Sequence, residues 1–144
     1  MAHPEFSCKV AVRPLPEQTD ASREQYAYAY TVTIVNTGDT AAQLIARQWW
    51  ITDHRGQVQE VRGLGAVGHQ PLLNPGEKFE YSSWAQIATP MGSMKGRYFC
   101  ITHDAHWFET EVPEFALADT AALLAGVGTL CLVFGTGTAW LVTM

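Results

Sequence analysis

The sequence predicts an all-β protein, an antiparallel β-sandwich of seven strands. Along most of its 144 residues, apolar or aromatic positions alternate with polar or small ones in short runs, and turn residues separate these runs. No amphipathic helical window of useful length occurs before Ala118, which disfavours a fold that layers helices on a sheet. A closed barrel made of the same strands is the alternative architecture.

The strands are expected where the alternation of apolar and polar residues is clearest. In the longest run, QYAYAYTVTIVN, three tyrosines are followed by Val32 and Ile34 on the same face. The turn NTGD then leads into the returning strand QLIARQWWIT. Residues 13–24 are too polar for the core and are expected to form a flexible excursion. The seven predicted strands are residues 6–13, 25–36, 43–52, 57–61, 79–84, 94–102 and 107–112.

Composition limits the classes of function. Lys and Arg total 9 against 14 Asp and Glu, a net charge of -5, so no basic field covers the chain and nucleic-acid binding is not expected. The three cysteines, Cys8, Cys100 and Cys131, are far apart and form no C-x-x-C pair, which favours a reducing cytosol over a disulfide framework. The first residues lack the features of a secretory signal, so we expect a cytoplasmic domain.

The end of the chain differs from the rest. Residues 121–144 carry no charge, and as a helix they would be about 36 Å long, enough to cross a hydrocarbon layer of about 30 Å. Several glycines and threonines weaken this apolar stretch. We therefore divide the chain into a β-sandwich domain, residues 1–118, and an apolar tail, residues 119–144. The tail is expected either to tether the domain to the inner membrane or to be a poorly ordered extension.

The stretch EVRGLGAVGHQP contains Gly63, Gly65 and Gly68 at the spacing G-x-G-x-x-G. In dinucleotide-binding proteins this spacing joins a buried parallel strand to a helix whose N-terminus faces the pyrophosphate. Here the preceding residues alternate as an exposed strand does, and Pro71 and the turn NPGE follow, so a Rossmann site is not expected. A phosphate- or pyrophosphate-binding loop remains the alternative, with the glycine amides flanked by Arg62 and His69.

One stretch, HDAHWFE, offers metal-ligating side chains, with His103, Asp104 and His106 as weak candidates and Glu109 further along. Asp104 and Ala105 are expected to form the turn, which places the two histidines near opposite strand ends and Glu109 along an outward face. Weak binding of Co²⁺, Ni²⁺ or Zn²⁺ by the paired imidazoles is the hypothesis, and solvated polar residues are the alternative.

The tryptophans are the candidate interaction residues. Alternation places Trp49 and Trp50 on opposite faces of one strand, so one belongs to the core. The other is expected to be covered by a loop, the tail or a binding partner. Trp84 is the third candidate. No G-x-S-x-G elbow occurs and Cys100 lies in the middle of a predicted strand, where a thiol is inert, so neither an enzyme nor a cofactor is expected.

The motifs RQWWITD, VRGLGAVGHQP, LNPGEKFEY, TPMGSMKGRY and VPEF occur in this order, and over residues 6–117 the sequence resembles the ApaG family. The resemblance implies a fibronectin type III-like β-sandwich, one of the immunoglobulin-like folds. It also implies an association with tolerance or efflux of Co²⁺ and Mg²⁺ in bacteria. Related domains in eukaryotic F-box proteins and in a polymerase-delta-interacting protein look like partner-binding modules. No catalytic residues are implied, and family members stop before the region that corresponds to the tail.

These observations together predict a non-enzymatic domain that binds an unknown protein partner in the physiology of divalent-cation tolerance. Two alternatives stay open. One is a phosphate- or pyrophosphate-binding module that uses the loop from Gly63 to Gly68. The other is a membrane-tethered accessory of an ion transporter, with membrane contact through residues 121–144.

Overall fold

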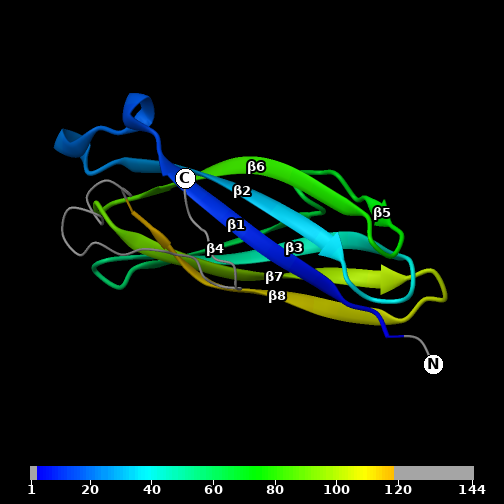
Figure 1. Ribbon diagram of the computed structural model, residues 1–144. Helices are drawn as coiled ribbons and strands as arrows, with labels where there is room; N and C mark the ends of the chain where they lie inside the picture. The colour runs from blue at the N-terminus through cyan, green and yellow to red at the C-terminus, as the bar shows by residue number, and fades with distance from the viewer. Residues whose placement is uncertain (1–2, 119–144) are drawn as a thin grey trace.

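The computed structural model describes residues 3–118, which form two antiparallel sheets packed face to face (Figure 1). The smaller sheet has the order β1-β2-β6, with β1 at Phe6–Pro14, β2 at Tyr26–Asn36 and β6 at Lys78–Ile87. This two-layer arrangement of antiparallel strands confirms the predicted β-sandwich.

The larger sheet has the order β4-β3-β7-β8. Its strands are β3 at Ala42–Asp53, β4 at Val58–Leu64, β7 at Gly92–Thr102 and β8 at Trp107–Leu117. The short strand β5, Leu72–Leu73, pairs with β3 beyond the end of β4. Both β4 and β5 therefore lie along the same edge of β3.

The prediction of seven strands is wrong by one, because β5 was not anticipated. Two residues are too few to show any alternation, and β5 exists only because β3 offers it a pairing edge. Strand β8 also runs beyond the predicted end at residue 112. A register shift between β7 and β8 leaves Pro113 without a ladder partner, so an edge strand tolerates a proline there.

The segment between β1 and β2 contains two short 3₁₀ turns, Pro16–Gln18 and Ala21–Arg23. The Asp20 carboxylate caps the second turn by accepting a hydrogen bond from the Ser22 amide at 3.1 Å. The predicted flexible excursion is thus a locally bonded pair of turns.

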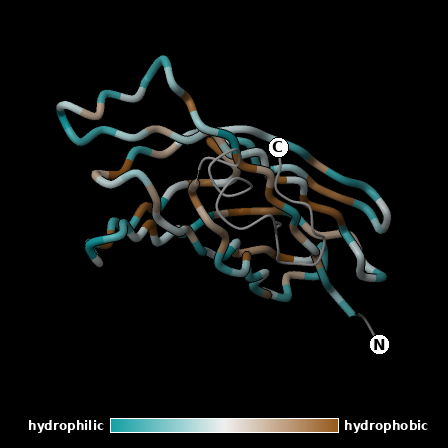
Figure 2. Tube along the Cα trace, turned by 60° about the vertical axis from the view of Figure 1, so that its left-hand side comes forward, coloured by the Kyte–Doolittle hydropathy of each residue, from teal (hydrophilic) through white to brown (hydrophobic). Residues whose placement is uncertain are grey.

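Trp49 is the centre of the core and is 1% exposed. Its ring packs at centroid distances of 5.8 Å from Tyr30, 5.9 Å from Tyr98 and 6.0 Å from Phe115, so aromatic side chains from both sheets meet on it. In Figure 2, hydrophobic positions recur along the strands, whereas the segments that connect them are more hydrophilic. The period-two alternation in the sequence is the cause of this distribution.

The predicted apolar tail, residues 119–144, and its two proposed roles lie outside the described residues. Between residues 3 and 118, no helix has the length and apolar character that crossing a bilayer requires.

Candidate functional site

The outer face of the larger sheet carries the candidate site. Three rows of residues cross this face from β4 to β7, because directly paired residues in neighbouring strands point to the same side. The rows are Glu60 with Trp50 and Lys95, then Arg62 with Gln48 and Arg97, then Leu64 with Ala46 and Phe99. An aromatic or apolar residue therefore occurs in two of the three rows, on a face that a monomeric sandwich normally leaves polar.

A stack of three side chains occupies the middle of this outer face. The Arg97 guanidinium lies over the Trp50 ring, 5.2 Å from its centroid, and 5.9 Å from that of Phe99. Arg97 Nη1 also donates to Glu109 Oε1 at 3.0 Å. The cation is therefore held in place with about a third of its side chain exposed.

Two hollows flank the Trp50–Arg97–Phe99 stack. One, of about 580 Å³, lies over β3, β7 and β8, and the other, of about 560 Å³, lies over β3 and β4. Val58 and Leu64 on β4 and Trp107 at the start of β8 are 58%, 66% and 65% exposed. Large apolar side chains thus remain open to solvent around the stack, which is typical of surfaces that bind another protein.

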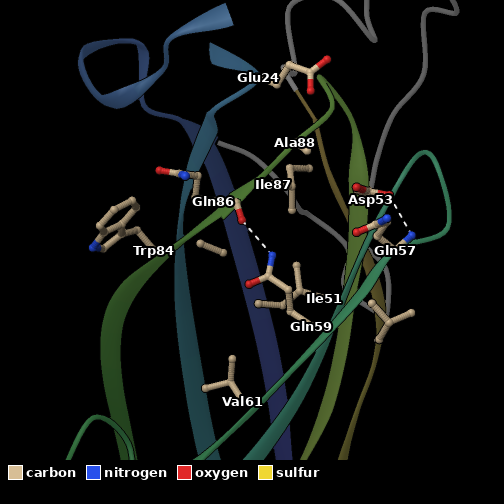
Figure 3. A pocket seen from close by; sticks show the side chains of 12 residues that line it. Glu24, Ile51, Asp53, Gln57, Gln59, Val61, Trp84, Gln86, Ile87 and Ala88 are labelled. Atoms are coloured by element: carbon tan, nitrogen blue, oxygen red, sulfur yellow. Dashed lines mark hydrogen bonds between the residues drawn. The ribbon is translucent and has the colours of Figure 1, made fainter.

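A third hollow, of about 450 Å³, lies between the edge strands β4 and β6 (Figure 3). Ile51, Val61 and Ile87 line it with apolar side chains. Gln59 Nε2 donates to the Gln86 carbonyl at 3.1 Å and so bridges the two sheets across this opening. The sandwich is therefore open along this edge, where the bond from Gln59 joins β4 to β6 and the ion pair between Arg55 and Glu24, at 2.7 Å, lies at one end.

Of the predicted interaction residues, only two lie on the surface. Trp49 is a core residue, and within the described part of the chain its indole Nε1 has no hydrogen-bond partner. Trp50 lies on the outer face under Arg97. Trp84 is 54% exposed, and Figure 3 shows its ring on the side of β6 away from Gln59 and Val61.

The three glycines of the G-x-G-x-x-G stretch do not share one bend. Gly63 belongs to β4, whereas Gly65 and Gly68 follow the strand with φ of +58° and +88°. The amides of both residues are already bonded, Gly65 to the Ile45 carbonyl at 2.7 Å and Gly68 to the Leu64 carbonyl at 3.0 Å. Ala66 and His69 also bond each other, so these four amides are not free to surround an anion.

The side chains expected to flank the loop have other contacts. Arg62 Nε donates to Glu60 Oε2 at 2.7 Å, and this bond together with one from Gln48 lowers the pKa of the Glu60 carboxyl, with Gln48 the larger cause. The His69 ring packs 6.0 Å from the Phe79 ring. The structure thus brings neither predicted donor into a common site with free amides, and the anion-binding hypothesis stays a prediction.

The residue that sequence reasoning missed near the glycines is Arg47. Its Nη1 donates to the carbonyls of Leu64 at 3.0 Å and Gly65 at 3.2 Å. A Cβ at Gly63 would lie 2.8 Å from the Arg47 guanidinium, so Gly63 provides the space in which this side chain packs. Alternation could have identified Arg47, because a charged residue two positions from the core residue Trp49 lies on the inward face of the strand and needs polar partners there.

The predicted metal ligands in the hairpin between β7 and β8 do not converge. His103 Nδ1 lies 3.2 Å from Thr40 Oγ1, whereas His106 Nδ1 lies 3.3 Å from Asp104 Oδ1. Hydrogen bonds from Thr102 and then His106 lower the pKa of Asp104. Glu109 instead pairs with Arg97. Across the described residues, no three His, Cys, Asp or Glu side chains lie close enough to hold a metal ion.

The two described cysteines are buried and free. Burial raises the pKa of the Cys100 thiol to about 12 and that of Cys8 further still. A thiol with so high a pKa is scarcely ionised at neutral pH, so neither Cys8 nor Cys100 offers a reactive nucleophile.

Comparison with known proteins gives a consistent result. The family model described as the ApaG domain matches residues 16–102. The chain is 58% identical over 118 residues to "Protein ApaG" of Ralstonia nicotianae, an alignment that covers 82% of this chain and 95% of that protein. A second "Protein ApaG", from Dechloromonas aromatica, is 50% identical over 119 residues, covering 80% and 94% of the two chains. A crystal structure of an ApaA protein from Bordetella pertussis shares 51% identity with a TM-score of 0.78, covering 81% of this chain and 94% of that one.

Proposed function

This chain belongs to the ApaG domain family, and from that premise we propose that it is a protein-interaction module that binds its partner on the outer face of the larger sheet. The observation that carries the proposal is the Trp50–Arg97–Phe99 stack between two hollows. Tryptophan and arginine are the residues most enriched among those that dominate binding energy at protein interfaces.

The geometry also supports a role without catalysis. Arg97 is neutralised by Glu109 and held over Trp50, which is an arrangement that binds and positions rather than transfers protons. The thiols of Cys8 and Cys100 are buried, and the candidate ligands of the hairpin bond to separate neighbours. We therefore assign the cobalt and magnesium tolerance expected from the family to a partner of this domain, and not to coordination by the domain itself.

The free thiols of Cys8 and Cys100 fit a domain that works in the reducing cytoplasm. The proposed partner is accordingly a cytoplasmic protein or the cytoplasmic part of a membrane protein. Its surface should present apolar groups to Val58 and Leu64 and a carboxylate or an aromatic ring to Arg97.

Affinity capture with matched variants tests the proposal. The full chain, Trp50→Ala and Trp84→Ala are used as baits in bacterial lysate, with and without Co²⁺, and the captured proteins are quantified. A partner of the outer face is retained by the wild type and Trp84→Ala, and its recovery falls at least about tenfold with Trp50→Ala, because a buried tryptophan anchor contributes about 2 kcal/mol. Equal recovery of every protein by both variants would contradict the proposed surface.

A further inference from the structure

We propose that two copies of this chain associate through the free edge of β4, so that their larger sheets join into one continuous sheet around a two-fold axis. The inference goes beyond the proposed function, because it concerns the edge of the sheet and a second copy rather than the outer face and a different protein.

The backbone of β4 has one bonded side and one free side. In an antiparallel ladder, alternate residues exchange both of their hydrogen bonds with the neighbouring strand. Asp53 N donates to Gln57 O at 2.9 Å at one end of the β3–β4 ladder, and Gly65 N donates to Ile45 O at 2.7 Å at the other end. Both bonds involve odd-numbered residues on the β4 side. The odd-numbered residues of β4 therefore bond β3, and the even-numbered ones direct their backbone groups away from it.

The free side of β4 is accessible. Every residue of β4 is exposed or half-buried, whereas β3 has five buried residues along its length. Among the described strands β4 pairs only with β3, and it forms the end of its sheet. An unpaired edge of this length is a template for a further strand.

The sequence of β4, VQEVRGL, is self-complementary when two copies run antiparallel. If Val61 lies opposite Val61 of the second copy, Glu60 faces Arg62 of the second copy and Arg62 faces Glu60 of the second copy. The same register places Val58 opposite Leu64 of the second copy. Opposite charges and apolar side chains thus meet across a two-fold axis, which is the requirement for a closed dimer.

This register is distinguished from its neighbours. If one copy of β4 is shifted by one residue, its even-numbered residues lie opposite odd-numbered residues of the other copy. The backbone groups of those odd-numbered residues already bond β3, so the two copies cannot pair. A shift by two residues places Glu60 opposite Glu60, or Arg62 opposite Arg62, which is unfavourable on one face of a sheet. Only the register centred on Val61 satisfies both the backbone and the charges.

The backbone bonds of the dimer can be counted. Glu60 and Arg62 form two reciprocal pairs, each of which exchanges two hydrogen bonds. The Leu64 carbonyl already accepts from Gly68 N and Arg47 Nη1, both at 3.0 Å, so the outer pairs depend on the Leu64 amide and the Val58 carbonyl alone. The dimer therefore gains about six backbone hydrogen bonds from the ladder geometry.

Charges on an edge strand often serve to block such pairing. On β4, however, Arg62 Nε lies 2.7 Å from Glu60 Oε2 in the same strand, so the edge carries no net charge that repels a second copy. The alternation of sign is what makes the strand complementary to itself.

Sedimentation equilibrium of the full chain over a range of concentrations tests the inference. The wild type should form a dimer. Glu60→Arg should dissociate at least about tenfold more readily, because each Glu–Arg pair becomes a pair of like charges and the change occurs twice in the dimer. Arg62→Glu should have the same effect. The double variant Glu60→Arg with Arg62→Glu restores the opposite charges and should restore the dimer.

The matched control is Glu80→Arg on β6, an exposed carboxylate on the other edge strand of the opening, which should leave the dimer unchanged. Circular dichroism checks that each variant is folded. A monomer at all concentrations would overturn the inference. So would self-association that neither single variant weakens, since other residues would then carry it.

The outcome is separable from that of the proposed function. Trp50→Ala removes the anchor of the outer face and leaves the charges of β4 intact, so this variant should lose the partner and keep the dimer. A wild-type monomer that still captures a partner would overturn the dimer alone, and a dimer whose Trp50→Ala variant captures every protein as well as the wild type would overturn the proposed function alone.

Discussion

The two long edges of the sandwich are built differently. At one edge, β1 packs against β8, and the rings of Phe6 and Phe108 meet edge to face at 5.5 Å. At the other edge, β4 and β6 are joined by the single polar contact between Gln59 and Gln86. The first edge closes the core, and the second leaves backbone and apolar side chains open.

The difference separates the part of the sandwich that closes the core from the part that we propose for recognition. Phe6 is 5% exposed and belongs to the core, whereas the Leu64 side chain on β4 is 66% exposed to solvent. Burial of apolar area is the dominant source of stability, so the closed edge contributes more to folding. We expect the fold to depend less on the open edge, and we propose this edge for binding other chains.

The largest effect should come from breaking the closed edge. Phe6→Ala removes a buried ring and its contact with Phe108, and we expect the free energy of unfolding to fall by about 3–4 kcal/mol. Urea denaturation measures the change. The matched control at the open edge, Leu64→Ala, should alter the unfolding free energy by no more than about 0.5 kcal/mol. Equal decreases in the unfolding free energy for Phe6→Ala and Leu64→Ala would show that the two edges contribute equally to stability.

A smaller loss is expected at the end of β4. Gly65 has φ of +58°, and a Cβ there would overlap the His69 carbonyl oxygen, so Gly65→Ala should destabilise the protein by about 2 kcal/mol. Gly56 has φ of +87° with open space around it, so Gly56→Ala should cost only about 1 kcal/mol. Thermal unfolding of both variants gives the comparison, and a larger loss for Gly56→Ala would contradict the crowding at Gly65.

Two buried tyrosines between the edges should make the stability of the protein fall at alkaline pH. Burial raises the pKa of Tyr81 and Tyr98, whose hydroxyl oxygens lie 2.5 Å apart, above the ordinary value of about 10. Because the pKa is higher in the folded state, their contribution to stability is complete below pH 10. It is lost as the pH rises from there toward the raised folded-state values.

Each of these tyrosines should therefore lower the unfolding free energy by up to about 1.4 kcal/mol per pH unit above pH 10. Urea denaturation between pH 8 and 11 measures the slope. Tyr81→Phe should make the slope shallower, at a cost of about 1 kcal/mol at neutral pH for the lost hydrogen bond. An unchanged slope would show that Tyr81 ionises normally in the folded state.

The smallest effect concerns the polar tie across the open edge. Gln59→Ala removes the bond to the Gln86 carbonyl, but both residues are exposed, so the unfolding free energy should fall by no more than about 0.5 kcal/mol. The matched control is Gln43→Ala, which removes the bond from Gln43 Nε2 to the Gln70 carbonyl at 3.0 Å and should lower the unfolding free energy by a similar amount. A loss above about 2 kcal/mol for Gln59→Ala would mean that this edge is part of the stable core.

The sequence predicted the fold well because alternation is a local signal. The face shared by Tyr28, Tyr30, Val32 and Ile34 is buried as expected, since each of these side chains needs only its own strand to set its direction. Strand β5 could not be predicted in this way, because its two residues are ordered by pairing with β3 and not by their own pattern.

The site was harder to predict, because it depends on contacts between distant strands. Alternation placed one of Trp49 and Trp50 outside the core without saying which, and the Arg97 side chain that lies over Trp50 comes from another strand. Arg47 approaches Gly63 only through the register of β3 and β4. Arg62 and His69 are close to the glycines in sequence, but in the structure Arg62 bonds Glu60 and the His69 ring packs against Phe79.

Residue-resolved hydrogen exchange of the full chain tests most directly whether the open edge is a recognition surface. Amides of Val61 and Gly63 bond β3 and should exchange slowly at every protein concentration. The amides of Glu60 and Arg62 should exchange rapidly in dilute protein and become protected as the concentration rises. Exchange at Glu60 and Arg62 that is equally fast at all concentrations would contradict the account.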